Sequence, residues 1–434
     1  MRGQLTGPLT GPLADRAFRA LDARLEPDVD RPVALALSGG GDSMALLDLA
    51  CAWAGARGRR VLALTVDHRL NRDSADWSRL AQAAARAAGA DWRGLAWDKP
   101  KPATGLPAAA RTARHRLLAE AARAAGARVI LTGHTADDVA EADWMRAEGS
   151  TLGRLRDWSP SPAWPEGRGL MLLRPLLGQT RQALREHLSA RSLDWIEDPA
   201  NVDPRFARSR ARAALAETGV RSILVFPPPC DGSLPLAMGG GLFRVDRAVG
   251  ARALAAALVC AGGGQRTPRG EKVEAIRARL AAGADFDAVL AGARLTARGQ
   301  DVVMFRNAGE YARRPPPTAR LIPGQAVAWD GRFEITARET GLRVAPAVGR
   351  LAALSRADRA WLKTLPPGAR GGLPVLIRDD GSDPVLAWGR AEVRCLVERR
   401  LAQALDQTPH ETDLDPAPNG ATPGNTLSSF PNIH

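Results

Sequence analysis

The chain has 434 residues, which is too long for one ordinary hydrophobic core, so we expect two or three domains. Its 60 Lys and Arg against 47 Asp and Glu leave a net charge of +13, which favours a polyanionic partner such as nucleic acid. Arginine is common throughout the sequence, however, so charge alone is weak evidence for that partner.

The four cysteines are scattered along the chain, at 51, 230, 260 and 395. No C-x-x-C pair occurs, so neither a zinc ribbon nor an iron–sulfur cluster is indicated. Few cysteines in a large chain fit a reducing compartment. The sequence also has no signal-peptide core and no membrane-spanning window, so we expect a soluble cytoplasmic protein.

Up to about residue 215, apolar runs alternate with alanine-rich stretches of helical periodicity. The apolar runs predict buried strands at 32–37, 60–66, 127–133 and 170–176. The alanine-rich stretches predict helices at 43–56, 74–88, 107–125, 135–148 and 180–191. This alternation predicts an α/β fold with a parallel sheet covered by helices on both faces. Ligands of such sheets bind beyond the carboxyl ends of the strands.

Two segments rich in Pro and Gly, 98–105 and 157–169, interrupt the pattern and are interpreted as mobile loops that cover the site. The pattern ends near residue 218. We expect a mixed, partly helical accessory domain over 219–315, which includes a hairpin at 293–307. A small α+β domain is expected over 320–404, and the polar, proline-rich residues 405–434 are predicted to form a disordered tail.

A glycine-rich segment, Ser38 to Ser43 (SGGGDS), follows the first predicted strand and precedes a helix. Three glycines allow successive N–H groups to point into one concavity, and the helix adds free N–H groups and the positive end of its dipole. Asp42 can bind magnesium or cap the helix. The segment therefore predicts a pyrophosphate site. Taken without the rest of the sequence, it is explained equally well as an ordinary turn in which Asp42 caps the helix. Neither G-x-x-x-x-G-K-[ST] nor G-x-G-x-x-G is present.

Asp67 and His68 end the second predicted strand, at the same edge of the sheet, where an adenosine would lie. A plain turn at the end of a strand explains these two residues equally well.

An imidazole and three carboxylates follow the third predicted strand. Asp137, Asp138 and Glu141 lie three, four and seven residues after His134, which places all four along one stripe of the predicted helix. Acids in a first helical turn complement the helix dipole, but this does not explain Glu141 or His134. We interpret the group as functional.

Basic residues gather in two further segments. Arg111, Arg114 and His115 share one side of a helix, which is either a solvated face or a phosphate site. Arg208, Arg210 and Arg212 follow an acidic, turn-rich segment and are positioned to bind phosphate or RNA, unless they only reflect the arginine bias of the chain.

Together these segments resemble the N-type PP-loop ATPases, and among them the bacterial tRNA(Ile)-lysidine synthases. SGGGDS is similar to the pyrophosphate loop of that superfamily. The other similar segments occur in the order of the family: VDH (66–68), AARTARHRLL (109–118), GHTADDVAE (133–141), LLRPLLGQTRQALREHL (172–188) and EDPANVDPRFARSRAR (197–212). The resemblance is strong over the first 215 residues and loose afterwards.

The resemblance implies a Rossmann-like ATPase domain over 1–218, followed by accessory tRNA-binding domains. It implies a ligase that joins lysine to C2 of the wobble cytidine, C34, in a CAU-anticodon isoleucine tRNA. The lysidine so formed makes the tRNA read AUA instead of AUG. ATP and Mg²⁺ are the implied cofactors, ATP ends as AMP and pyrophosphate, and a homodimer is compatible with this assignment.

The resemblance also implies roles for single residues. ATP would be held by Ser38, Gly39, Gly40, Gly41, Asp42, Ser43, Asp67 and His68, and the metal by Asp42. The implied catalytic residues are Asp42, Arg114, His134, Asp137, Glu141 and Arg208. Lysine would be recognised by Asp137, Asp138 and Glu141.

The implied chemistry agrees with physical requirements. Oxygen at C2 of cytosine is a poor leaving group, so it must first attack the α-phosphate of ATP and expel pyrophosphate into the glycine loop. Magnesium and arginine offset the charge on the phosphates. The lysine amine then attacks C2 and AMP leaves, with carboxylates to recognise the ammonium group and take its proton. The cytidine is expected to leave the anticodon stack.

Some local departures from the family pattern exist. AEGSTLG (147–153) stands where the family has Arg-Gly-Ser-Gly, Ser209 replaces a common Asn, and His115 a common Tyr. Three rivals are a PP-loop tRNA thiolase, a small-molecule PP-loop amide ligase and a degenerate RNA-binding protein. Absence of cysteine from every motif argues against a thiolase, the basic surplus against a small-molecule ligase, and the intact acids against degeneration.

Overall fold

The computed structural model describes residues 9–71, 73–150, 153–197, 207–218, 232–315 and 318–414. These residues divide into two compact units, one formed by the residues up to 218 together with 408–414, and the other by 232–407. Each unit is described by itself. Within the described ranges, no helix has the length and apolar character that a membrane span requires.

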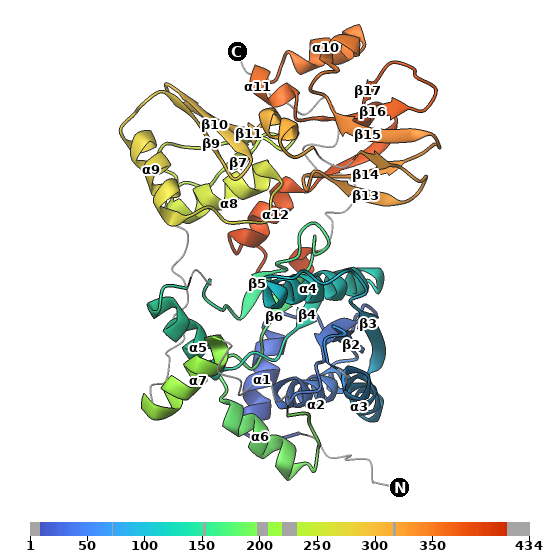
Figure 1. The fold of residues 1–434 in the computed structure, drawn as a ribbon, viewed down its shortest axis with the longest axis vertical. Coiled ribbons are helices and arrows are strands. Elements are labelled where there is room, and N and C mark those ends of the chain that lie inside the picture. Colours follow the sequence, from blue (N-terminus) through green and yellow to red (C-terminus); the bar gives the residue numbers. More distant parts are fainter. Residues whose placement is uncertain are drawn as a thin grey trace. The chain divides into compact units, whose positions relative to one another are not determined.

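The first unit is built on a six-stranded sheet with the order β3-β2-β1-β4-β6-β5 (Figure 1). Five strands are parallel neighbours: β1 (Val33–Ala36), β2 (Val61–Asp67), β3 (Asp91–Ala96), β4 (Val129–Leu131) and β6 (Met171–Leu173). Strand β5 (Trp158–Pro160) runs antiparallel to β6 at the edge. The helices of this unit are α1 (Pro12–Asp22), α2 (Gly41–Ala56), α3 (Ser74–Ala87), α4 (Leu106–Ala124), α5 (Ala136–Ala147), α6 (Arg181–Ala190) and α7 (Ala207–Thr218).

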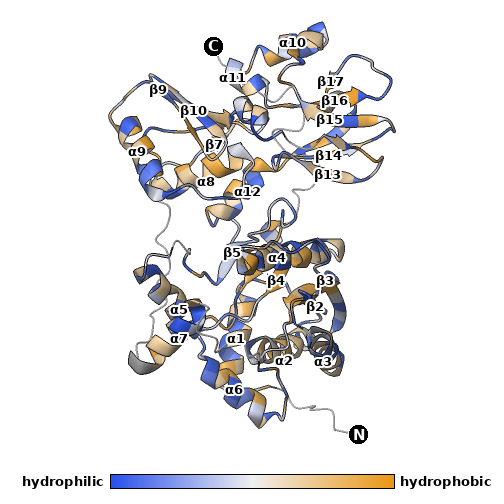
Figure 2. Cartoon of the chain, in the orientation of Figure 1, coloured by the Kyte–Doolittle hydropathy of each residue, from blue (hydrophilic) through white to orange (hydrophobic). Residues whose placement is uncertain are grey.

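Side chains alternate between the two faces of this sheet, and helices cover both of them. On one face Leu35, Ala63 and Leu131 pack with α1, α2, α3 and α6. On the other face Leu62 and Ile130 pack against α4. Apart from β3, the parallel strands are buried over most of their length, and β2 and β4 are coloured mainly as hydrophobic in Figure 2, as expected of a covered parallel sheet. The predicted α/β fold class is therefore confirmed, although α1, β3 and α7 were not predicted.

Residues 157–169 differ from the prediction that they form a mobile covering loop. They contain β5, and the side chains of Trp158 and Trp164 are buried. The prediction failed because the prolines and glycines of this segment interrupt the apolar pattern. The buried surface is supplied instead by the two tryptophans. The other predicted covering segment, 98–105, has no helix or strand.

The second unit consists of antiparallel sheets and helices, in agreement with the predicted accessory α+β region. One sheet has the order β7-β8-β11-β10-β9. Its strands are β7 (Leu236–Ala237), β8 (Phe243–Arg244), β9 (Phe286–Leu290), β10 (Ala293–Arg298) and β11 (Asp301–Arg306), and it packs with α8 (Ala251–Gly262) and α9 (Gly270–Ala281). The pair β10–β11 confirms the predicted hairpin, with Arg298 opposite Asp301 at its turn.

Two smaller sheets share a separate hydrophobic core within the second unit. They are formed by β12 (Ala319–Arg320), β15 (Leu342–Pro346), β16 (Pro374–Arg378) and β17 (Val385–Leu386), and by β13 (Ala326–Trp329), β14 (Phe333–Ala337) and β18 (Ala391–Cys395). The helices of this region are α10 (Arg356–Leu362), α11 (Pro367–Arg370) and α12 (Val397–Ala404). The division at 219–315 and 320–404 stays a prediction, and residues 219–231 lie outside the described residues.

Residues 405–414 correct the prediction of a disordered tail from 405 onward. After α12 the chain returns to the first unit, where Glu411 pairs with Arg59 through two contacts of 2.9 and 3.1 Å. Trp158 donates its indole N–H to the carbonyl of Thr408 at 2.7 Å, and Leu414 joins the hydrophobic core. The prediction failed here because the polar composition of the segment gives no sign of these buried contacts. Residues 415–434 lie outside the described residues.

Candidate active site

The candidate site lies where the strand order reverses, between β1 and β4, a position at which open α/β sheets bind ligands. The loops after these two strands touch each other. A Cβ on Gly133, which follows β4, would lie 2.9 Å from the carbonyl oxygen of Asp42. Glycine is therefore needed for the two loops to come this close, and α2 and α5 begin at the same edge of the sheet.

The glycine loop is held in a fixed bend by its two serines. The N–H of Ser38 donates to Oγ of Ser43 at 3.2 Å, and that hydroxyl donates to the carbonyl of Gly40 at 2.8 Å. Gly39 has φ +83°, and a Cβ there would lie 2.4 Å from the side chain of Ile196. Helix α2 starts at Gly41 with Gly40 as its N-cap, so its first N–H groups lie at this bend.

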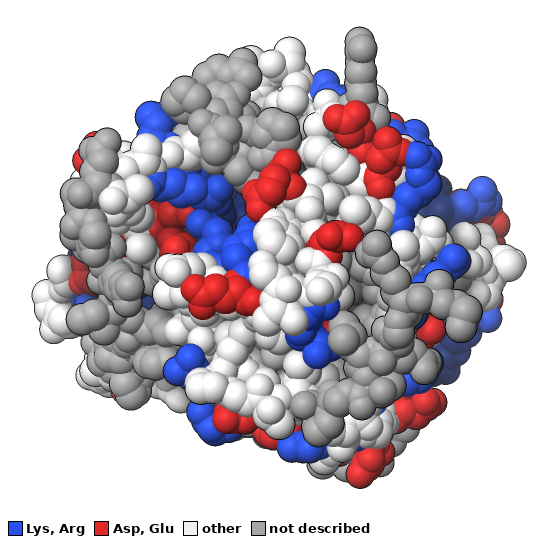
Figure 3. Space-filling model, turned by 90° about the horizontal axis from the view of Figure 1, so that it is seen from below, with Lys and Arg blue, Asp and Glu red and all other residues white. Residues whose placement is uncertain are grey.

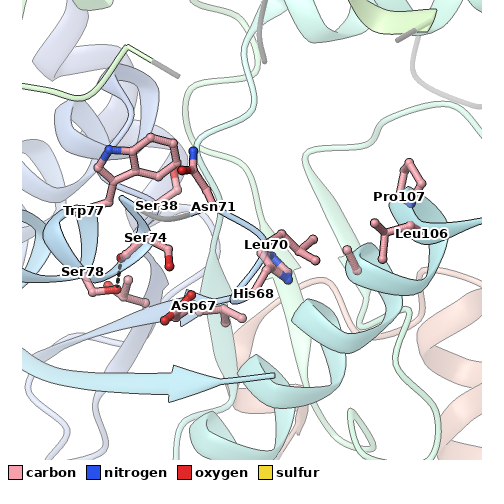
Figure 4. A pocket seen from close by; sticks show the side chains of 13 residues that line it. Ser38, Asp67, His68, Leu70, Asn71, Ser74, Trp77, Ser78, Leu106 and Pro107 are labelled. Carbon is pink, nitrogen blue, oxygen red and sulfur yellow. Dashed lines mark hydrogen bonds between the residues drawn. The ribbon is translucent and has the colours of Figure 1, made fainter. Parts of the chain in front are cut away.

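A cavity of about 800 Å³ adjoins the loop, and Figure 4 shows the side chains that line it. Ser38 and Trp77 lie at one end, and Leu106 and Pro107 of α4 at the other. Its size and its mixture of apolar and polar walls suit a nucleoside. The strand-end residues predicted for adenosine, Asp67 and His68, both line this cavity, together with Ser38.

Asp67 and His68 have different surroundings inside the cavity. One carboxylate oxygen of Asp67 accepts from the N–H of Arg69 at 2.7 Å. Nδ1 of His68 is buried without a hydrogen-bond partner among the described residues. Burial, reinforced by the charge of Arg114, lowers the pKa of His68, so its imidazole is neutral at physiological pH.

The acids Asp137 and Asp138 both stabilise helix starts. Asp138 accepts from the N–H and the hydroxyl of Thr135, at 2.9 and 3.1 Å, and so caps α5. Asp137 accepts from the N–H of Arg181 at 2.7 Å and so holds the first turn of α6. Burial opposes ionisation of Asp138, whereas the Thr135 N–H and the charges of Arg181 and Arg208 favour its carboxylate form.

Glu141 is the most deeply buried acid of the group, with 1% of its surface exposed. Its Oε1 accepts from Arg212 Nε at 2.6 Å and from both terminal nitrogens of Arg181 at 3.3 Å. Its Oε2 is buried and has no hydrogen-bond partner in the described part of the chain. A buried carboxylate oxygen without a donor is costly, so this atom is a natural acceptor for a ligand.

Arg181 connects the glycine loop with the acids of α5. Its Nε lies 3.3 Å from Oδ2 of Asp42, and the same guanidinium lies 3.8 Å from Asp138 and 3.3 Å from Glu141. Although burial works against the charge of Arg181, these acids raise its pKa. Burial raises the pKa of Asp42, which Arg181 and Arg185 oppose.

Further arginines form a positively charged side of the site. Burial and the neighbouring charges of Arg111 and Arg208 lower the pKa of Arg114 to about 10. Arg208 lies 3.4 Å from Asp138, whereas the described residues place no carboxylate within 4 Å of Arg114. On the face of the molecule shown in Figure 3, basic and acidic side chains lie together in a hollow, with further acidic side chains at its rim. The like charges of Arg111, Arg114 and Arg208, held close together, favour an anionic ligand.

His134 lies between β4 and α5, not on the helix itself as predicted, because α5 begins two residues later. Its Nδ1 is 3.1 Å from the hydroxyl of Thr132 and 3.3 Å from Nε of Arg174. Burial and the charge of Arg174 lower its pKa to about 3. His115 of α4 is also buried, and its pKa falls to about 3 for the same kind of reason.

The structure thus brings the predicted residues to one edge of the sheet. Ser38 to Ser43, Asp67 and His68 border the cavity or the loop, while the three acids, His134, Arg114 and Arg208 lie beside them. Three arginines were missed: Arg174, Arg181 and Arg185. All three lie in the segment 172–188. Their positions relative to the strand could have identified them, because Arg174 directly follows β6 and Arg181 begins the next helix.

Of the described cysteines, Cys51 lies on α2 of the first unit, whereas Cys260 and Cys395 belong to the second unit. Burial raises the pKa of Cys51 to about 12, and those of Cys260 and Cys395 to about 11. Cys230 is outside the described residues. Among the residues that the structure places, no group of three or more His, Cys, Asp or Glu is arranged to hold a metal. The raised pKa values of these three described thiols do not support a role in sulfur transfer.

Comparison with known proteins agrees with this site. Residues 13–218 match the family model of the PP-loop domain. A tRNA(Ile)-lysidine synthase from Caulobacter vibrioides is 48% identical over 400 residues, which cover 90% of this chain and 97% of that protein. A second, from Hyphomonas neptunium, is 37% identical and covers 74% of this chain and 93% of that protein.

Among solved structures, a U34-tRNA thiolase from Methanococcus maripaludis has 17% identity and a TM-score of 0.39, with 47% of this chain and 72% of that chain covered. The two synthases match most of their own length as well as most of this sequence. The chain therefore belongs to the tRNA(Ile)-lysidine synthase family.

Proposed function

We propose that this protein ligates lysine to C2 of the wobble cytidine in a CAU-anticodon isoleucine tRNA, with ATP as the energy source and an adenylated cytidine as the intermediate. The observation that carries this proposal is the position of Arg181. Its guanidinium joins Asp42 of the glycine loop to Glu141, with 3.3 Å to each. A nucleotide at the loop and an amine at Glu141 would therefore share one site.

ATP fits the loop and the cavity beside it. The adenosine would occupy the cavity between Trp77 and Leu106, and the phosphates would meet the N–H groups at the start of α2. We propose that the bend fixed by Ser38 and Ser43 receives the pyrophosphate that leaves.

One carboxylate oxygen at the glycine loop, Oδ1 of Asp42, is suited to bind Mg²⁺. Oδ1 of Asp42 is buried and lacks a hydrogen-bond partner among the described residues, although Arg185 lies 3.6 Å away. One carboxylate is enough when phosphates and water complete the shell, which is the usual arrangement for Mg²⁺. Mg²⁺ bound there would neutralise charge on the phosphates.

In the adenylation step, the cytidine O2 forms a bond to the α-phosphorus and the bond to the pyrophosphate oxygen breaks. Arg114 and Arg208 are proposed to stabilise the negative charge that this step concentrates on the phosphate oxygens. No carboxylate of the described residues forms an ion pair with Arg114, which supports this role because no described acid neutralises its charge.

In the second step, the lysine nitrogen bonds to C2, the C2–O bond breaks and AMP leaves. We assign the acceptance of the amine proton to Oε2 of Glu141, the buried oxygen without a partner. Asp137 and Asp138, also expected to recognise lysine, would act mainly by holding α6 and α5 in place, since the structure gives both carboxylates helix-capping contacts.

The RNA partner of this proposal matches the basic surplus of the chain, +13 overall. The target base must leave the anticodon stack to reach the edge of the sheet. A cytoplasmic location follows from the proposed substrate, and a homodimer stays a prediction.

The direct test is incorporation of labelled lysine into a CAU-anticodon isoleucine tRNA in the presence of ATP. We expect incorporation by the wild-type chain and essentially none by Asp42→Ala. The matched control is Asp76→Ala, an exposed acid in the first turn of α3, which should retain activity. Sulfur incorporation into the RNA would select the thiolase, and ATP cleavage to AMP without RNA would select the small-molecule ligase.

A further inference from the structure

We propose that Arg174 is a positioning residue which holds His134 in its neutral form with the proton on Nε2, so that His134 acts in the reaction as a hydrogen-bond donor and not as a general base. This inference rests on the proposed function only in placing His134 at the reacting groups. The protonation state itself follows from contacts within the protein.

The sheet brings Arg174 and His134 together. Leu131 of β4 is paired with Leu173 of β6, and the N–H of Thr132 donates to the carbonyl of Leu173 at 3.0 Å. The next residues along the two strands therefore emerge side by side. Nε of Arg174 and Oγ1 of Thr132 both reach Nδ1 of His134, at 3.3 and 3.1 Å.

These contacts determine which ring nitrogen is protonated. A guanidinium has only N–H donors and cannot accept a hydrogen bond. Nδ1 of His134 must therefore present its lone pair to Arg174, and the single proton of a neutral ring lies on Nε2. The structure shows no partner for Nε2 among the described residues, so this N–H is left for a ligand.

The charges that surround His134 favour the neutral ring. Arg174 follows β6, Arg114 lies on α4 and Arg208 on α7, and all three oppose a positive charge on the imidazole. His115 of α4 is also close. Asp138 of α5 favours protonation but already accepts two hydrogen bonds from Thr135. Together with burial, the positive groups outweigh Asp138 and lower the pKa of His134 to about 3.

Arg174 is itself rigidly held by neutral groups. It is buried, and it donates to the carbonyl of Arg156 at 2.6 Å and to the hydroxyl of Ser159 at 3.0 Å. The described residues place no carboxylate within 4 Å of it. Burial lowers its pKa only to about 10, so it stays charged at neutral pH. A fixed guanidinium that forms no ion pair with a described residue both orients the imidazole and opposes its protonation.

This arrangement assigns the protons of the reaction. A neutral Nε2–H can donate to a phosphate oxygen or to the leaving oxygen on C2, where negative charge develops. It cannot receive the proton of the lysine amine, because its only lone pair is directed at Arg174. That proton must pass to another acceptor, for which Oε2 of Glu141 is available.

The first experiment is NMR spectroscopy of the full chain with ¹⁵N-labelled histidine, with the His134 signals identified from their loss in His134→Gln. Between about pH 5.5 and 8, a range that spans the ordinary histidine pKa, we expect a protonated Nε2 and an unprotonated Nδ1. In Arg174→Gln the two tautomers should mix and the ring should titrate nearer to its ordinary pKa. A protonated Nδ1 in the wild type, or an unchanged ring in a folded Arg174→Gln, would overturn the proposal.

If Arg174→Gln does not fold, Thr132→Val takes its place, because Arg174 alone should then still keep Nδ1 unprotonated. Loss of the Nε2–H tautomer in Thr132→Val would contradict the assignment to Arg174. Thr112→Val, which removes an exposed hydroxyl on α4, is the matched control for this substitution.

The second experiment compares the lysine ligation of two His134 variants. Glutamine retains an N–H donor but is no base, so His134→Gln should keep kcat/KM within about tenfold of the wild type. His134→Ala should lose about 100-fold. Equal loss in both variants would overturn the donor role. Because the NMR result does not depend on activity, a failure of the ligation assay in the wild type itself would count only against the proposed function.

Discussion

Two buried Arg–Glu pairs in the first unit differ in how completely they are satisfied. Glu411 pairs with Arg59, both side chains are fully buried, and each of its oxygens accepts a hydrogen bond. Glu141 is buried as deeply, but its contacts with Arg181 and Arg212 use only Oε1. In the Glu411 pair both carboxylate oxygens are used, although Nε of Arg59 has no hydrogen-bond partner among the described residues. An acceptor left open in the interior is a cost to the fold, and indicates that a ligand completes it.

The largest expected effect comes from Glu141→Gln. This change keeps the volume of the side chain but removes the proposed proton acceptor, so lysine ligation should fall about 1,000-fold. Measurement of kcat/KM for lysine checks this, with Glu120→Gln on the surface of α4 as the control. Activity within tenfold of the wild type would show that Oε2 is not the acceptor.

Glu411→Gln should have the opposite profile. Loss of one partner from a fully buried ion pair should lower the free energy of unfolding by about 3 kcal/mol, as measured by urea denaturation. The kcat of the protein that remains folded should be unchanged. The double variant with Arg59→Met should lose less stability than the sum of the two single changes. Additive losses would mean that the pair is not coupled.

Arg114→Met extends the comparison to a desolvated charge that has no ion pair within the described part of the chain. We expect ATP-dependent adenylation of the tRNA to fall about 100-fold, because a positive charge near the phosphates is lost. The thermal midpoint should stay the same or rise, since a desolvated charge is removed. A strongly lowered midpoint would instead assign Arg114 to the fold.

The smallest effect concerns pH. The pKa values of His115 and His134 are lowered to about 3 in the folded chain, below the ordinary value of 6.5. The unfolded chain therefore binds more protons between these values, so stability should be fully present above about pH 6.5 and decline as the pH falls toward 3. His115→Gln should reduce this slope in denaturation measured at several pH values. An unchanged slope would place the His115 ring in contact with solvent.

The parts of the fold that local pattern determines could be predicted from the sequence. The run 33–37 is wholly apolar and became the central strand β1, whereas β3, with the sequence DWRGLA, was missed because a partly exposed edge strand carries polar residues. The glycine loop and the acids of α5 could be found because each lies within a few consecutive residues.

Contacts between distant segments could not be predicted in the same way. The contacts of Arg174 and Arg181 with the site arise only because β4 and β6 lie side by side in the sheet. Arginine is also so frequent in this sequence that neither residue is distinguished by its type. Glu411 pairs with Arg59, which lies 352 residues away in the sequence, and no local sequence pattern predicts this contact.

The return of residues 408–414 makes the region from 232 to 407 an insertion within the first unit. During synthesis, the ribosome must therefore complete the whole inserted unit before the partner of Arg59 and the core residue Leu414 become available. Until then, Arg59 in the newly synthesised first unit lacks its ion-pair partner, Glu411. Its final consolidation should be a late event in translation, and a fragment that ends at residue 218 should be less stable than the same residues in the full chain.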